Sequence, residues 1–81
     1  YVPFSESFLA EFCPSDAKFI GAPIDYLIFK NASKVTDKEE AEVELVFCDV
    51  KTGKSQLNKV QRAIKAAVEA GRVRWKTLEL K

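Results

Sequence analysis

The chain has 81 residues, of which 47% are hydrophobic and 31% are charged, and its formal net charge is +1. This composition is typical of one small soluble domain with a thin core, and we expect residues 1–81 to form a single domain. It excludes a bilayer-spanning segment, because no apolar run is long enough, and nothing at the amino end resembles a signal peptide. Two cysteines cannot form a disulfide framework, so we expect free thiols in a cytoplasmic protein, and the absence of histidine and of a Cys-x-x-Cys motif argues against a metal role for these thiols.

The first twelve residues carry Phe4, Phe8 and Phe12 at helical spacing. This spacing predicts a short helix or turn that packs one aromatic edge against the core. Residues 14–16 are predicted to form a turn, and residues 18–20 a short strand.

Residues 21–30 form a near-continuous apolar run, interrupted only by Asp25 near its start. Such a run is typical of a strand that is buried on both faces of a sheet. Residues 31–42 are mostly polar and contain no repeat, so we interpret them as the linker of a hairpin.

The next strand ends in charged residues. Val43, Leu45 and Phe47 alternate onto one face, and the same period of two places Asp49 and Lys51 on that face. Burial of an ionised group costs several kcal/mol unless the group is paired or bound to a metal, so this pattern favours a functional site. The alternative is that the two charges only mark the solvated end of a strand.

A hairpin centred near Asp37 would align the two strands in a definite register. Leu27 would then lie opposite Phe47, and Asp25 opposite Asp49. Two like charges in that position destabilise a sheet by themselves, and a divalent cation between the carboxylates makes the arrangement favourable.

A turn over residues 52–55 precedes a predicted helix from Gln56 to about Ala70, with Ser55 as its cap and Gly71 after its end. Its apolar stripe is predicted to comprise Leu57, Val60, Ile64, Ala67 and Val68. Gln61 shares this stripe and needs a hydrogen-bond partner, which we expect at the end of the Asp49 strand. The alternative is that its amide tilts outward to water.

A closing strand is predicted from about Arg72 to Leu80, with Val73 and Trp75 on one face. Leu78 and Leu80 fall out of phase with them, which indicates a bulge or the end of pairing near residue 77.

Charge is distributed unevenly along the chain. Residues 1–50 contain ten acidic residues and four lysines, a net of −6, whereas residues 51–81 have a net of +7. A basic block that begins at the predicted site is the pattern expected where a phosphate backbone approaches. The alternative is a solvated helix face that is neutralised by the acidic half of the same molecule.

Three stretches carry a resemblance to a known family. Phe-Ile-Gly-Ala-Pro-Ile-Asp-Tyr-Leu-Ile-Phe (19–29), Val-Lys-Thr-Gly-Lys-Ser (50–55) and Gly-Arg-Val-Arg-Trp (71–75) together resemble the archaeal endonucleases related to Holliday junction resolvases, in the PD-(D/E)XK nuclease superfamily. The resemblance covers nearly the whole chain beyond Phe12. It implies an α/β fold with a restriction-endonuclease-like three-layer core, whose mixed sheet has an antiparallel hairpin followed by a helix and a closing strand.

The same resemblance implies a set of site residues. Asp25 would be the first metal ligand, Asp49 the second, and Lys51 the catalytic lysine, with the backbone carbonyl of Val50 as a further ligand and Gln61 in support. The cation would be Mg²⁺, with Mn²⁺ expected to substitute, and it would activate a water for phosphodiester hydrolysis.

The implied function is a Mg²⁺-dependent DNA endonuclease, selective for branched or junction structures and active as a homodimer. DNA-backbone contacts are expected from Thr52, Lys54, Lys59, Arg62 and Lys65. The chain departs from the family pattern in two respects: the second carboxylate is more often Glu, and related domains begin with a longer helix that we expect residues 1–81 to lack.

Two alternatives belong to other functional classes. One is a nucleic-acid-binding module that descends from nucleases and has lost cleavage. The other is a protein-interaction domain, which requires both the acidic pair and the basic block to be accidental.

Overall fold

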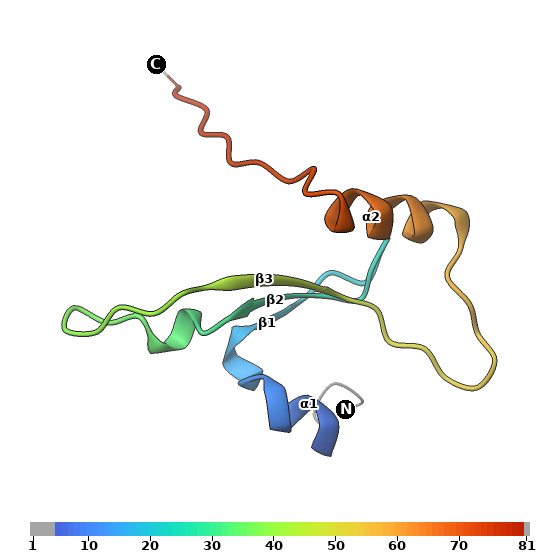
Figure 1. Cartoon of the computed structure of the whole chain (residues 1–81), viewed down its shortest axis with the longest axis horizontal. Helices are drawn as coiled ribbons and strands as arrows, with labels where there is room; N and C mark the ends of the chain where they lie inside the picture. Colours follow the sequence, from blue (N-terminus) through green and yellow to red (C-terminus); the bar gives the residue numbers. More distant parts are fainter. Residues whose placement is uncertain (1–4, 81) are drawn as a thin grey trace.

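A three-stranded antiparallel sheet lies at the centre of the computed structural model, which describes residues 5–80. Its strands are β1 (Ala17–Phe19), β2 (Tyr26–Lys30) and β3 (Glu44–Cys48), and they lie side by side in that order (Figure 1). Every pairing is antiparallel, so the expected mixed sheet is wrong for the described part of the chain. The order leaves β3 at an edge of the sheet.

The predicted hairpin register is confirmed. Leu27 lies opposite Phe47, and the ladder between β2 and β3 ends at the pair Tyr26 and Cys48. Asp25 and Asp49 are one position beyond this last pair in the same register, just outside the hydrogen-bonded ladder. The alternation of apolar side chains excludes a slip of one residue, which would move every side chain to the other face, and the position of the linker centred near Asp37 selects this register among those that alternation allows.

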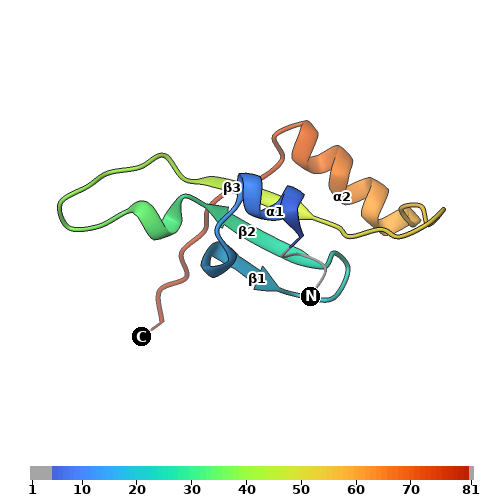
Figure 2. The ribbon, with the colours of Figure 1, turned by 90° about the horizontal axis from the view of Figure 1, so that it is seen from below.

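Helices lie on both sides of the sheet (Figures 1 and 2). α1 (Glu6–Glu11) lies on one side, and α2 (Lys59–Glu69) lies on the other. The predicted amino-terminal helix is confirmed, with Ser5 as its cap, and its Phe8 is 7% exposed on the same side as Phe12, 5.2 Å away between ring centroids. Phe4, which the prediction included, lies outside the described residues. Ile28 in the central strand is fully buried.

The arm, defined as residues 31–43 between β2 and β3, is hydrogen-bonded to the start of the sheet through one buried carboxylate. Asp16 is 5% exposed and ends a short 3-10 helix, η2 (Pro14–Asp16). Its two oxygens accept hydrogen bonds from the backbone N–H (3.0 Å) and the hydroxyl (3.2 Å) of Ser33, in a second 3-10 helix, η3 (Ala32–Lys34). A buried carboxylate that accepts two bonds is satisfied, so Asp16 has a structural role.

α2 begins three residues later than predicted. Asn58, and not Ser55, is the cap, because Asn58 and Gln61 form a capping box that satisfies two backbone N–H groups at once. The predicted end is confirmed: Gly71 has a φ of 74°, and its N–H donates to the Val68 carbonyl (3.1 Å). The Arg72 N–H donates to the Ala67 carbonyl (2.8 Å), which completes a Schellman motif.

α2 packs loosely on the sheet. A cavity of about 260 Å³ separates its apolar side from Phe47 and Ile24, and Leu57, Ile64 and Val68 also line it. Val60 is 58% exposed, so its placement in the apolar stripe is wrong. Within residues 5–80, no helix is long and apolar enough to cross a membrane.

The predicted closing strand is not formed. Residues 72–80 contain no strand, and Trp75 is 90% exposed. The alternation of Val73 and Trp75 shows only which side chains would share a face if the segment were extended. A strand also needs a hydrogen-bonded neighbour, and no strand among the described residues pairs with this segment.

Candidate functional site

The site lies where β2 begins and β3 ends. Asp25 directly precedes β2, in a turn closed by its carbonyl, which accepts from the N–H groups of Ile20 (2.8 Å) and Gly21 (3.1 Å). Gly21 has a φ of 90°, a conformation that L side chains rarely adopt. The Asp25 side chain reaches across to the other strand, where Oδ2 accepts from the Val50 N–H at 2.7 Å. The turn and this bond hold Asp25 beside the chain that carries Asp49.

Asp49 and Lys51 form an ion pair. Asp49 Oδ2 lies 3.0 Å from Lys51 Nζ, and the two side chains are 13% and 33% exposed. The angles at this contact do not meet hydrogen-bond geometry, so the buried Oδ2 has no hydrogen-bond donor in the described part of the chain. A buried carboxylate oxygen satisfied only by a neighbouring charge retains a lone pair for another ligand.

Gln61 connects α2 to these charges. Its Nε2 donates to Asp49 Oδ1 (3.2 Å) and to the Pro23 carbonyl (2.8 Å), and its Oε1 accepts from Lys51 Nζ (3.2 Å). The predicted contact between Gln61 and the end of the Asp49 strand is therefore confirmed. The oxygen of this one amide binds the Lys51 ammonium and its nitrogen binds the Asp49 carboxylate, so Gln61 restricts the orientation of both charged side chains.

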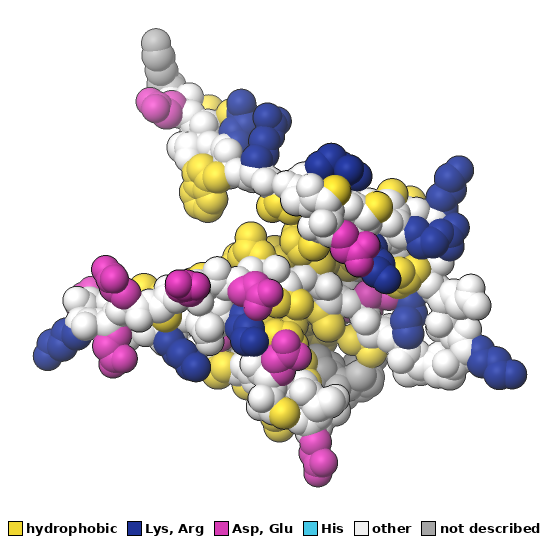
Figure 3. All heavy atoms as spheres, viewed as in Figure 1, with side chains coloured by type: hydrophobic (Ala, Val, Ile, Leu, Met, Phe, Trp, Pro, Cys, Tyr) yellow, Lys and Arg dark blue, Asp and Glu magenta, His cyan; other side chains and the backbone are white. Residues whose placement is uncertain are grey.

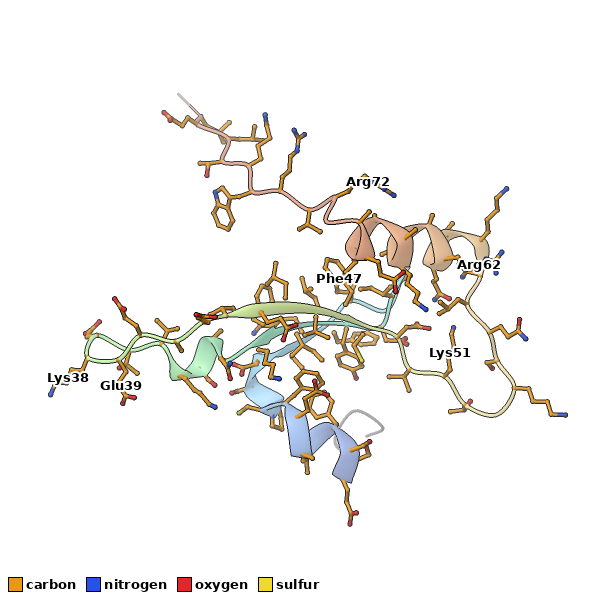
Figure 4. All side chains as sticks on the ribbon, in the orientation of Figure 1. Lys38, Glu39, Phe47, Lys51, Arg62 and Arg72 are labelled. Carbon is orange, nitrogen blue, oxygen red and sulfur yellow. The ribbon has the colours of Figure 1, made fainter. Side chains whose placement is uncertain are left out.

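Lys51 points from the loop after β3 toward α2 (Figure 4). Thr52 and Lys54 follow it in an exposed loop, in which the Ser55 N–H donates to the Thr52 carbonyl (3.2 Å) as the predicted turn requires. Both residues therefore lie on the solvent side of the site.

The basic residues of α2 are also exposed. Arg62 bends back so that Nη1 donates to the Leu57 carbonyl at 2.6 Å, while Lys65 lies at the rim of the cavity beneath the helix. Lys59 is exposed at the first position of α2. Lys and Arg side chains gather over α2 and the loop before it, whereas Asp and Glu gather over the arm between β2 and β3 (Figure 3).

The acidic pair affects the electrostatics of its surroundings. The pKa of the Cys48 thiol is raised, first by burial and then by the negative charges of Asp25 and Asp49. A neighbouring thiol thus senses both carboxylates, as expected where two like charges share a poorly hydrated region.

The site supplies two carboxylates for a cation. No group of three or more His, Cys, Asp or Glu side chains is placed to hold a metal in residues 5–80. Asp25 and Asp49 are hard oxygen ligands, and the buried Asp49 Oδ2 without a donor fits such a role. Further ligands would have to come from backbone carbonyls, water or the substrate.

Two residues of the site were absent from the sequence-based set. Asn58 donates its N–H to Gln61 Oε1 (3.0 Å), and the Pro23 carbonyl accepts from the same side chain (2.8 Å). The Asn-x-x-Gln spacing of a capping box was a readable signal for Asn58. A backbone carbonyl leaves no such signal in a sequence.

Comparison with known proteins gives one match. Residues 1–80 match the model of a protein family described as "Endonuclease related to archaeal Holliday junction resolvase". The class of protein is thus endonuclease. The chain belongs to this family of endonucleases related to the archaeal Holliday junction resolvase, which confirms the resemblance found in the sequence. No curated protein matches the chain, and neither does any solved structure.

Proposed function

We propose that this domain hydrolyses phosphodiester bonds of DNA with the help of a divalent cation, and that it prefers branched or junction DNA. The observation that carries the proposal is the network in which Gln61 holds the ion pair of Asp49 and Lys51 beside Asp25. Membership of an endonuclease family supports the reaction, and the junction-resolvase kinship in its description supports the substrate.

Asp25, Asp49 and the Val50 carbonyl would hold the cation, which is Mg²⁺ in this proposal, with Mn²⁺ as a substitute. The bound cation would supply a water of lowered pKa and offset charge on the phosphate. The lone pair on the buried Asp49 Oδ2 supports this assignment. Two aspartates at adjoining strand ends with a lysine two residues later also support placement in the PD-(D/E)XK superfamily.

Lys51 would act on the phosphate itself. Its ammonium lies 3.0 Å from Asp49 Oδ2 and 3.2 Å from Gln61 Oε1, and its side chain keeps 33% exposure, so Nζ is both held and open to a ligand. A preorganised cation at this place would stabilise charge that develops on the phosphate oxygens. Gln61 would keep the ammonium directed at the site between turnovers.

DNA would approach over the basic surface, which comprises Lys54, Lys59, Arg62 and Lys65, with the neutral Thr52 as a further contact beside it. These exposed side chains lie on the loop after the site and on α2, so a backbone bound along them would pass Lys51. Contacts of this kind position nucleic acid without reading its sequence. We therefore propose recognition of DNA shape.

A second candidate function is DNA binding without cleavage. The observation that favours it is the limited ligand set, because no third His, Cys, Asp or Glu joins Asp25 and Asp49 among the described residues.

One experiment separates the candidates. The full chain is incubated with Mg²⁺ and with labelled duplex, single-stranded and four-way junction DNA, beside Asp49→Asn as the site variant and Asp37→Asn as a matched control on the exposed arm. We expect cleavage by the parent and the control, strongest on the junction, and its loss in Asp49→Asn. Binding without Mg²⁺-dependent cleavage would establish the second candidate, and absence of both would overturn the two together.

A further inference from the structure

The cavity beneath α2 has a volume of about 260 Å³ and mostly apolar walls. Both α2 and the sheet side contribute to it, and the apolar side chains that line it are Ile24, Phe47, Leu57, Ile64 and Val68. Apolar cavities of roughly 150 Å³ admit a benzene ring, so this cavity has room for a larger planar ring system. Phe47, which lies between β3 and α2 (Figure 4), is 37% exposed and is therefore not fully covered by protein.

Polar side chains complete the lining of the cavity. Asp49 and Gln61 belong to it and also to the candidate site. Lys65 and Glu69, one turn apart on α2, line it as well. Both are exposed, and neither forms a side-chain hydrogen bond or an ion pair in the described part of the chain. An ammonium supplies donors and a carboxylate supplies acceptors, so the cavity suits a ligand that has apolar faces and a polar edge.

The cavity adjoins the surface proposed for DNA. Lys65 belongs to the basic surface and Asp49 to the proposed cation site, so a DNA backbone that runs from one to the other passes the cavity. A nucleobase is the part of DNA that combines two apolar faces with an edge of hydrogen-bond donors and acceptors. A base inside an intact duplex must first be unstacked and unpaired before it can enter a pocket, whereas an unpaired base avoids most of that cost.

We propose that the cavity beneath α2 binds one unpaired base of the DNA, beside the phosphate that lies at the candidate site. The base stacks on Phe47, and its edge faces Lys65 and Glu69. This inference rests on the proposed function in that the basic surface must bind DNA, but it does not require cleavage. It favours branched DNA over intact duplex without reading sequence, because every base has an apolar face.

Binding measured in chelator tests the pocket apart from cleavage. The probes are a duplex with a single unpaired adenine and the same duplex with an abasic nucleotide at that position, so the two DNAs carry equal charge. The full chain should bind the adenine duplex at least about tenfold more tightly, on the scale of one base stacked on an aromatic side chain. Equal dissociation constants for the two duplexes would overturn the proposal.

Three variants locate the base. Val68→Phe fills the cavity and should abolish the preference for adenine, while binding to fully paired duplex, which depends on phosphate contacts, stays within about twofold of the parent. Val60→Phe makes the same change at a 58% exposed position of α2 outside the cavity and should keep the preference.

Phe47→Leu is the third variant. It keeps an apolar wall without a ring and should reduce the preference several-fold, which decides the question if Val68→Phe does not fold. An undiminished preference in folded Val68→Phe or in Phe47→Leu would place the base elsewhere and overturn the pocket.

Acrylamide quenching supplies a direct readout. With 2-aminopurine as the unpaired base, this neutral quencher should reach the base less in the parent complex than in free DNA, and equally in the Val68→Phe complex and free DNA. Equal quenching in the parent complex and free DNA would overturn the pocket. The two proposals fail separately: cleavage without a preference for the unpaired base overturns the pocket alone, whereas the preference without Mg²⁺-dependent cleavage overturns hydrolysis alone.

Discussion

Asn58 and Gln61 bond to each other reciprocally at the start of α2. The Gln61 N–H donates to Asn58 Oδ1 (2.8 Å), and the Asn58 N–H donates to Gln61 Oε1 (3.0 Å). Because the same Oε1 also accepts from Lys51 Nζ, one amide serves both the helix cap and the candidate site.

The role of Gln61 in the candidate site can be separated by experiment from its role in the helix cap. Asn58→Ala should lower the free energy of unfolding by about 1 kcal/mol and leave DNA cleavage within a few-fold of the parent. Gln61→Ala should lower stability comparably and reduce cleavage at least about tenfold, because Lys51 and Asp49 lose their common hydrogen-bond partner. Chemical denaturation and single-turnover cleavage measure the two effects. Equal losses of cleavage in both variants would assign Gln61 to the cap alone.

Lys51 and Lys54 lie three residues apart and differ in their contacts. Lys51→Ala should reduce Mg²⁺-dependent nicking at least about a hundredfold, the scale seen when a preorganised charge is removed from a site. Lys54→Ala, in the exposed loop, should change nicking only a few-fold, and DNA binding should survive in both variants. Comparable activity of Lys51→Ala and the parent would remove the role given to this lysine.

Cation binding should appear in thermal stability without any substrate. Mg²⁺ at about ten times its dissociation constant should stabilise the parent by about 1.4 kcal/mol, which is several degrees for a domain of this size. Asp25→Asn and Asp49→Asn should show almost no response, whereas Asp37→Asn should respond like the parent. Mn²⁺ should act at lower concentration. A full response in both site variants would show that the cation binds elsewhere.

The basic surface should determine how DNA affinity depends on salt. Lys59, Arg62 and Lys65 replaced together by Gln should weaken binding to all sequences alike and flatten the log–log salt slope by about 0.9 for each phosphate that is no longer neutralised. Replacement of Lys18, Lys34 and Lys38 by Gln removes the same charge from other parts of the surface and should leave the slope nearly unchanged. Equal slopes in the two triple variants would indicate charge acting only at long range.

The two thiols should react at different rates. The pKa of Cys13 is lowered by hydrogen bonds from the side chain and backbone of Ser15, and the pKa of Cys48 is raised by burial and the nearby aspartates. At mildly alkaline pH, iodoacetamide should therefore label Cys13 first, because the thiolate is the nucleophile. Asp49→Asn should accelerate labelling of Cys48 by lowering its pKa, which mass spectrometry would detect. Faster labelling of Cys48 than of Cys13 in the parent would contradict this.

Local alternation and the position of the polar linker together were enough to predict the hairpin. Alternation assigns Leu27 and Phe47 to the same face, and a linker centred near Asp37 places them opposite each other, as the structure has them. The position of Gln61 was also predictable, since a helix that buries its apolar side brings that amide to the strand end. The hairpin and the position of Gln61 both depend on residue patterns within short stretches of sequence.

The start of α2 and the state of residues 72–80 were not predictable by the same means. Ser55 is a good cap, but Asn58 forms two bonds with Gln61 where Ser55 would form one. Strand alternation in the carboxy-terminal segment says nothing about whether a neighbouring edge is within reach. That depends on where the turn at Gly71 directs the chain.

Because a cavity lies beneath α2, we expect this helix to open as a unit separate from the rest of the fold. Ile28 belongs to a closely packed region, whereas α2 is joined to the sheet across a space of about 260 Å³ and through the hydrogen bonds of Gln61. Elements with little buried apolar contact open at lower free energy than the core and do so as separate units. We therefore expect the backbone amides of α2 to exchange with solvent through local opening, and those of β2 to exchange only on global unfolding. Each such opening would remove Gln61 from Lys51 and Asp49 in a chain that is otherwise still folded.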